Sequence, residues 1–388
     1  MDTTKHTVLA SSIANSVYSH SFSHSKELHE ATVAFMRSEK FLKEIEVLVT
    51  ERNYTASGIF QVVKPFLDSF SPKKLDDEFL RQVYFFALEK SFPEAVTEKS
   101  DPVLENINRV FLNILKQVCD FQKHSTDRTW QSKYPLLFLT TKEEAALESP
   151  LEYKRFVKAF RDQYIYEMMK LNQEIMKHDT LDHICGVHHV AMHIGRQLKA
   201  AGHPIDLGRV CGAAAGHDIG KYGCKANEAK RVPYLHYYYT DLWFLRNDIP
   251  YIGHIAVNHS TWDLELENLP IESLILIYAD FRVKGRAGED GKSRMHIYNL
   301  KESFEVILNK LDNVDDAKER RYRRVYSKLR DFEDFMLGMG IDTCLETEPG
   351  TDMSYDPLAL KARDKRYYSL MSGEETVRSP VSYTHLRA

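Results

Sequence analysis

Apolar residues recur at steps of three and four along most of the chain, which is the spacing of a buried helix face. The expected helices in the first half span residues 26–49, 57–70, 76–90, 102–119 and 151–177. Turn-prone stretches such as residues 69–74 separate them, and residues 299–338 are again helical and strongly charged. Since no stretch alternates apolar and polar residues long enough to indicate a sheet, the predicted fold class is all-α.

The break between two groups of predicted helices indicates two domains. The chain has 388 residues, more than one ordinary domain contains, and its 43% hydrophobic content is enough to form a core. A polar stretch at 123–150 separates the groups. We therefore expect a helical accessory domain of unknown role at 1–150 and a second helical domain at 151–340. Residues 341–388, rich in Gly, Pro, Ser and Thr, predict a loosely structured tail.

Charge and cysteine usage narrow the classes of partner. The formal net charge of -4 gives no overall attraction to nucleic acid or to an anionic membrane. No apolar run reaches transmembrane length, and the amino terminus lacks the pattern of a secretory leader. The 5 cysteines form no C-x-x-C pair, which favours a reducing compartment, so we expect a cytoplasmic protein. The apolar helices before residue 122 could bind a partner, form a homo-oligomer or simply pack on the other domain.

His217 and Asp218 stand side by side at the end of a run of small residues, in AAAGHDIGK. This run predicts a buried helix, and Gly220 is expected to end it in the left-handed conformation. A buried imidazole and carboxylate are costly unless something compensates, and a metal ion takes both as ligands. On its own the pair does not distinguish a metal site from chance neighbours.

Further ligand-type residues lie on the apolar stripes of other predicted helices: His183, His236, His259 and Asp280. Each has a structural alternative, because a core histidine can bond a backbone carbonyl and Asp280 could pair with Arg282. Several inward ligand-type residues on consecutive helices favour a metal site over these alternatives. His189 and His193 have ligand spacing too, but they share a polar face and predict a solvated surface.

The order of these residues resembles the H…HD…H…H…D signature of the HD-domain superfamily of metal-dependent phosphohydrolases. The segments HICGV, HDIGK, NHSTW and LILIYADF carry the resemblance, over about residues 179–285. The most similar subgroup is the bacterial di-iron hydrolases of symmetrical dinucleoside tetraphosphates. The chain lacks a Gly-Tyr-Pro segment after the HD pair and has Ile-Gly-Lys in place of an acidic pair. The cyclic-dinucleotide and (p)ppGpp subgroups are therefore disfavoured.

The resemblance implies an HD-domain helical bundle, preceded by the other helical domain, and a centre with two divalent ions, each Fe, Mn or Zn. One ion would be bound by His183, His217, Asp218 and Asp280, and the second by His236 and His259, with Asp218 bridging. A metal-activated hydroxide would attack a phosphoester or phosphoanhydride bond of a small, nucleotide-like substrate.

Three cations near these motifs are candidates for binding the substrate. Lys221 is expected to reach a phosphate oxygen, with a surface lysine at a helix end as its alternative role. Arg282 and Lys284 are weaker phosphate candidates. The aromatic candidates for stacking on a base are Tyr234, Tyr237, Tyr238 and Tyr239, although packing is the commoner role of such residues.

Two other functions stay open at this point. A di-iron oxygenase can use the same ligand set, and it would consume oxygen. A non-catalytic regulatory module would bind metal without turnover. The complete set of ligand positions favours an enzyme over that module.

Overall fold

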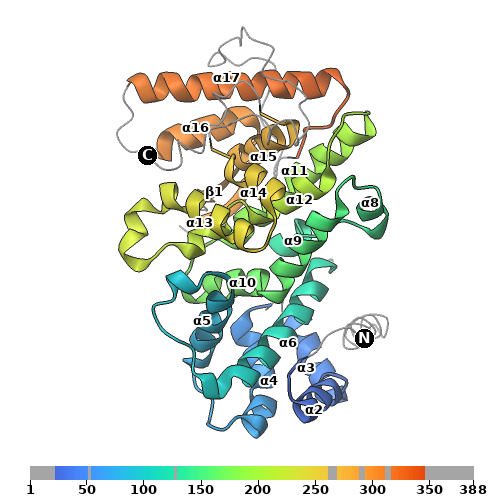
Figure 1. Cartoon of the computed structure of the whole chain (residues 1–388), viewed down its shortest axis with the longest axis vertical. Helices are drawn as coiled ribbons and strands as arrows, with labels where there is room; N and C mark the ends of the chain where they lie inside the picture. The colour runs from blue at the N-terminus through green and yellow to red at the C-terminus, as the bar shows by residue number, and fades with distance from the viewer. Residues whose placement is uncertain are drawn as a thin grey trace. The chain divides into compact units, whose positions relative to one another are not determined.

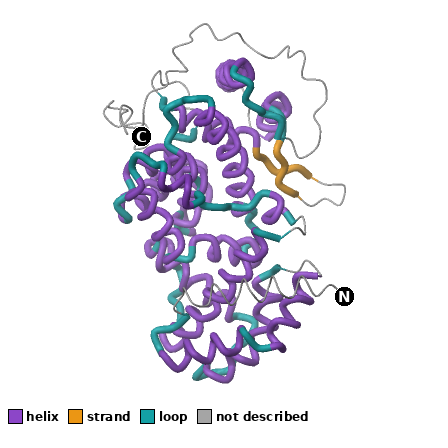
Figure 2. The backbone as a smooth tube through the Cα atoms, turned by 90° about the vertical axis from the view of Figure 1, so that its right-hand side faces the viewer, coloured by secondary structure: helices purple, strands orange, loops and turns teal. Residues whose placement is uncertain are grey.

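The computed structural model describes residues 22–50, 54–125, 129–260, 269–287, 293–310 and 316–345. Helices dominate this part of the chain, so the all-α prediction is confirmed (Figure 1). Its strands are β1 (Val283–Ala287) and β2 (Ser293–Ile297), which form a small antiparallel hairpin that the sequence analysis missed (Figure 2). Of the predicted tail at 341–388, residues 346–388 lie outside the described residues. Among the described helices, none is long and apolar enough to span a bilayer.

The chain divides into two compact units, which we describe separately. The first comprises Met1–Pro135, Phe160–Leu181 and Lys225–Ala229, and the second comprises Leu136–Ala159, Asp182–Cys224 and Lys230–Ala388. This division differs from the predicted boundary at residue 150. The chain returns to the first unit after Ala159, so residues 160–181 belong there rather than to the second domain.

The first unit is a helical assembly around an aromatic core. Its helices are α2 (Lys26–Met36), α3 (Glu39–Thr50), α4 (Ala56–Phe70), α5 (Phe79–Ser91), α6 (Glu105–Lys123), α7 (Trp130–Lys133) and α10 (Ile165–Ile175), with short 3-10 turns η1 (Pro93–Ala95) and η2 (Pro102–Leu104). Phe60, Phe79 and Phe111 bring α4, α5 and α6 together, with ring centroids 4.9 to 5.9 Å apart. Such aromatic contacts supply much of the burial that stabilises a core.

Two predicted helices are each broken in the structure. The stretch 26–49 forms α2 and α3, because the Ser38 hydroxyl accepts a hydrogen bond from the Phe41 N–H and so caps a new helix. The stretch 151–177 forms α9 (Pro150–Asp162) and α10, separated where Tyr164 takes a positive φ of 56°. Both breaks depend on local backbone geometry that an apolar stripe does not report.

The second unit contains the helices that carry the predicted ligands. Its elements are α8 (Thr141–Ala145), most of α9, nearly all of α11 (Thr180–Ala200), α12 (Leu207–Gly216), η3 (Ile219–Gly223), the end of η4 (Ala226–Arg231), α13 (Val232–Arg246), α14 (Pro250–Val257), α15 (Ile271–Arg282), the β1–β2 hairpin, α16 (Leu300–Lys310) and α17 (Asp316–Gly338). Helix α12 packs against α14 and α15, and α13 packs against α14 and η3.

The small residues of α12 allow its neighbours to come close. A Cβ at Gly216 would lie only 2.6 Å from Cζ of Phe244 on α13. Phe244 is fully buried and stacks on Phe156 of α9, with ring centroids 6.0 Å apart. The run Ala213–Gly216 therefore brings the end of α12, and with it the His217-Asp218 pair, deep into the unit.

Candidate metal centre

The six predicted ligand residues, which come from five segments of the chain, form two groups in the second unit. They are His183 in α11, His217 at the C-terminal cap of α12, Asp218 directly before η3, His236 in α13, His259 shortly after α14 and Asp280 in α15. All are buried except Asp280, whose burial is intermediate.

These residues form two groups, each able to hold a metal ion. In each group the ligand atoms all lie within 4.8 Å of one another. Group A consists of His183, His217 and Asp280, and group B consists of Asp218, His236 and His259. Within group A the Nε2 atom of His183 lies 3.0 Å from Oδ1 of Asp280 and 3.4 Å from Nε2 of His217.

Asp218, a member of group B, also approaches the histidines of group A. Its Oδ2 atom is 3.3 Å from Nε2 of His183 and 3.5 Å from Nε2 of His217, so it faces group A. Its Oδ1 atom is 3.5 Å from Nε2 of His236 and 3.9 Å from Nε2 of His259, so it faces group B. One carboxylate therefore presents one oxygen to each group.

Three of the histidines are held in one tautomer by the backbone. The Nδ1 atoms of His217, His236 and His259 lie 2.9, 2.8 and 2.6 Å from the carbonyl oxygens of Ala214, Val232 and Ala256. A carbonyl only accepts hydrogen bonds, so each Nδ1 carries the proton and donates it. In the neutral ring the Nε2 atom then keeps its lone pair, which is how metal-binding histidines are usually oriented.

Group B consequently brings acceptor atoms together around one point. The Nε2 atoms of His236 and His259 lie only 3.4 Å apart and both approach Oδ1 of Asp218. Burial lowers the pKa of both histidines to about 4, so at neutral pH neither ring carries the second proton that could be shared. Two lone pairs and a carboxylate oxygen in contact repel one another unless a cation lies among them. The donor set therefore fits a divalent metal ion.

Both carboxylates are ionised. Burial alone would raise the pKa of Asp218, but Lys221 and the surrounding histidines hold it well below the ordinary value. Burial would likewise raise the pKa of Asp280, and Lys284 and His183 lower it well below that value. The Nζ atom of Lys221 lies 2.6 Å from Oδ2 of Asp218, and that of Lys284 lies 3.2 Å from Oδ1 of Asp280. Asp280 therefore pairs with Lys284, and not with Arg282, the structural alternative that the sequence left open.

The centre reaches solvent beside group A. The side chains of Lys221, Lys284 and Asp280 are 34%, 22% and 24% exposed, whereas that of Asp218 is 4% exposed. In group B the side chains of His236 and His259 are only 6% and 4% exposed. The two ammonium groups thus lie on the more exposed side of the centre.

Arg282 was expected to bind a phosphate of the substrate, but its side chain lies in the core. It is fully buried, and its Nε atom donates to the Tyr298 carbonyl at 2.7 Å. Its Nη1 atom donates to the Thr343 carbonyl at 2.8 Å and to the Tyr278 hydroxyl at 3.0 Å. Since the guanidinium is engaged within the core, we do not retain Arg282 as a phosphate ligand.

Of the four candidate stacking residues on α13, Tyr237 contacts two histidines of the centre. Its ring centroid lies 3.9 Å from that of His236 and 4.7 Å from that of His259. Tyr234 and Tyr238 are 73% and 51% exposed and stand two positions from His236, which places them on the opposite side of the helix. Tyr239 is buried in the core.

The remaining α11 histidines do not join either group. His193 lies near the surface, with Nε2 3.1 Å from the Asp342 carbonyl oxygen. His188 is buried against Cys211, with Nε2 3.3 Å from Sγ. Burial lowers its pKa to about 3. Its burial means that α11 is covered on more than one face.

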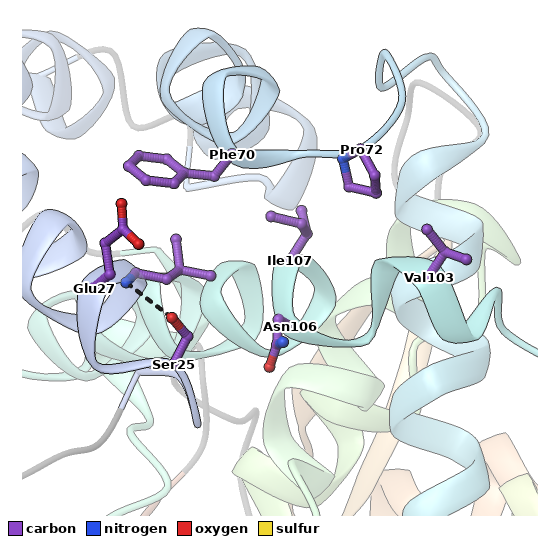
Figure 3. A pocket seen from close by; sticks show the side chains of 8 residues that line it. Ser25, Glu27, Phe70, Pro72, Val103, Asn106 and Ile107 are labelled. Atoms are coloured by element: carbon purple, nitrogen blue, oxygen red, sulfur yellow. Dashed lines mark hydrogen bonds between the residues drawn. The ribbon is translucent and has the colours of Figure 1, made fainter.

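The first unit has a cavity of its own. It measures about 240 Å³ and is lined by Ser25, Glu27, Leu28, Phe70, Pro72, Val103, Asn106 and Ile107 (Figure 3). All of these residues belong to the first unit. The lining is mostly apolar, and it shares no residue with group A or group B.

Comparison with known proteins gave no match. No protein-family model matches the chain, and neither a curated protein nor a solved structure matches it. The resemblance to the HD-domain superfamily therefore stays a prediction. The case for a function rests on the geometry of the ligand residues themselves.

Proposed function

We propose that this protein is a dinuclear metal-dependent phosphohydrolase of the HD-domain type. The observation that supports this best is the position of Asp218, whose two oxygens face different groups of imidazoles. A carboxylate in that position is suited to bridge two metal ions. Paired ions are a common arrangement in enzymes that cleave phosphate esters.

The ligands divide between two ions as follows. Asp218 would be shared, His183, His217 and Asp280 would hold one ion, and His236 and His259 would hold the other. Mixed imidazole and carboxylate ligands suit iron, manganese or zinc. When bound, such a pair supplies a hydroxide nucleophile at neutral pH and neutralises charge on phosphoryl oxygens.

The chain's own residues would orient the ligands and the substrate. The carbonyls of Ala214, Val232 and Ala256 hold the imidazoles with Nε2 facing inward. Lys221 and Lys284, which lie at the exposed side of group A, would bind the substrate's phosphoryl oxygens as point charges. Such contacts would favour a small phosphorylated molecule, and Tyr237, whose ring lies against His236, would contact its base or leaving group.

A matched pair of histidine variants tests the proposal. Protein purified anaerobically and loaded with Mn²⁺, Fe²⁺ or Zn²⁺ is assayed for phosphate or nucleotide release from mononucleotides, dinucleoside polyphosphates and bis(p-nitrophenyl) phosphate. His259→Ala removes a group B ligand, whereas His193→Ala removes a histidine outside both groups. We expect His259→Ala to lose more than about 100-fold in rate, since even partners of ligands cost roughly 10- to 100-fold. His193→Ala should stay within about twofold of the wild type, as expected of a surface change.

Three outcomes would contradict the proposal. Equal rates in the wild type and in His259→Ala would assign the activity to a contaminating enzyme. Oxygen consumption by the iron-loaded protein without release of phosphate would indicate an oxygenase. Firm metal binding with no turnover of any substrate would indicate a regulatory module.

A further inference from the structure

The segment that carries the His217-Asp218 pair lies directly against the backbone of α13. A Cβ at Gly220 would lie 2.0 Å from the carbonyl oxygen of His236 and 2.4 Å from the backbone nitrogen of Thr240. Among the described glycines, positive φ values occur at Gly202 and Gly340 and not at Gly220. The expectation that Gly220 takes the left-handed conformation was therefore wrong. Glycine is needed here because a helix backbone occupies the space of a side chain.

One hydroxyl links this segment to α13. Thr240 is fully buried, and its Oγ1 atom donates to the His217 carbonyl and accepts from the Gly220 N–H, both at 3.1 Å. These two bonds join the backbone on either side of Asp218. Thr240 also lies one helical turn after His236, on the same face of α13.

We propose that Thr240 is a positioning residue that sets the geometry of group B. This inference rests on the proposed dinuclear centre. The His236 ring is fixed to α13 by its bond to the Val232 carbonyl, and Asp218 is fixed to α13 through the Thr240 hydroxyl. The 3.5 Å distance between Oδ1 of Asp218 and Nε2 of His236 therefore depends on that hydroxyl.

Group A shares this link through the His217 carbonyl but has further supports that do not involve Thr240. Its ligands His183 and Asp280 come from α11 and α15, and their side chains contact each other at 3.0 Å. The His217 ring is held within its own segment by the Ala214 carbonyl. Loss of the hydroxyl should therefore weaken the ion of group B more than that of group A.

A purely structural role for Thr240 makes a different prediction, and two substitutions separate the roles. Thr240→Val keeps the volume but removes the hydroxyl, leaving the Gly220 N–H and the His217 carbonyl without that partner. Thr240→Ser keeps the hydroxyl but removes a methyl group. If the residue only filled space, Thr240→Ser would be the more damaging change.

The test is an anaerobic Mn²⁺ titration of the metal-free full chain. Calorimetry measures the binding of each ion, and electron paramagnetic resonance detects the signal of a coupled Mn²⁺ pair. The wild type and Thr240→Ser should bind two ions and show the coupled signal. Thr240→Val should keep the first ion, bind the second about 10- to 100-fold more weakly, and lose the coupled signal, as expected when a partner of a ligand is removed. Circular dichroism reports whether each variant is folded. If Thr240→Val does not fold, Thr240→Ala gives the same readout with a smaller side chain.

Two results would overturn the inference: a hydroxyl-free variant that binds both ions with wild-type affinity, or Thr240→Ser that loses the second ion as completely as Thr240→Val. A wild type that binds two ions but cleaves no phosphate ester would contradict the proposed function alone. The Thr240 comparison would still be read from metal binding. A wild type that binds no metal would overturn both.

Discussion

Each unit contains a cluster of polar side chains that is buried at least in part, but the charges of the two clusters are balanced in different ways. In the first unit, Nζ of Lys123 lies 2.8 Å from Oδ1 of Asp120. Burial raises the pKa of nearby Glu167, and the positive charges of Lys116 and Lys123 act against that rise. Opposite charges of the protein thus face each other there. In group B of the second unit, two neutral imidazoles and a carboxylate oxygen face one another instead.

The difference shows which buried groups indicate a ligand. Burying charge is costly in either unit, so burial and polarity alone do not identify a metal site. A cluster in which each acceptor atom faces a cation or a hydrogen-bond donor of the protein needs nothing further. A cluster of acceptor atoms with their protons turned outward toward backbone carbonyls needs a cation.

The largest difference between the two clusters is expected in the rate of hydrolysis, when one aspartate of each cluster is changed to asparagine. Asp218→Asn removes the shared carboxylate charge, and we expect hydrolysis to fall more than about 1000-fold, or roughly 4 kcal/mol of transition-state stabilisation. Asp120→Asn in the first unit should leave the rate within about twofold. The measurement is steady-state product release at saturating Mn²⁺. Similar rates in the two variants would remove the distinction between the clusters.

Glu272 is a buried carboxylate that belongs to neither metal group, and it should make the free energy of unfolding depend on pH. Burial raises the pKa of Glu272 to about 7, although the Asp206 N–H donates to it. An acid whose pKa is raised on folding stabilises the fold fully below its ordinary pKa. That contribution is lost as the pH rises toward 7. Over this range the wild type should lose up to about 3 kcal/mol of unfolding free energy from this group.

Glu272→Gln should not show this loss. Urea unfolding at pH 5 and pH 8 measures the free energy of unfolding of both proteins. Glu272→Gln should be more stable relative to the wild type at pH 8 than at pH 5. A stability difference that is the same at both pH values would show that Glu272 is not protonated in the folded protein.

The smallest effect is expected on stability, when the Lys123–Asp120 pair of the first unit is broken. Lys123→Met removes the partner of Asp120 and a positive charge near Glu167. Breaking a fully buried pair costs roughly 3–5 kcal/mol, and we expect about 2 kcal/mol because the Asp120 side chain is 50% exposed. Urea unfolding gives the loss, and elemental analysis should find the metal content unchanged. Loss of metal from this variant would mean that the clusters do not act independently.

The inward position of the ligand-type residues was predictable because a helix places one face inward, whereas their convergence in space was not. His183, His236 and Asp280 lay on apolar stripes, and the structure groups each with other ligand-type residues. Thr240 could not be identified from periodicity, because it is one of several buried residues on the same face of α13. Its role follows from the approach of η3 to α13, a tertiary contact with no sequence period.

The errors have similar causes. Arg282 follows Asp280 closely in sequence, but acceptors from Tyr298 and Thr343 hold it in the core. The break before α10 depends on the positive φ of Tyr164, a conformation that residue type alone does not favour. Periodicity therefore predicted which faces are buried, but not the partners that distant segments supply.

The metal content of wild-type protein purified anaerobically, and again after reconstitution, tests the central claim most directly. Elemental analysis should give about two equivalents of iron, manganese or zinc per chain, the number expected of a dinuclear site. Asp218→Asn purified in parallel should lose most of this metal. A folded wild-type protein that contains no metal and takes up none on reconstitution would contradict the account, and would leave the six residues as part of the core.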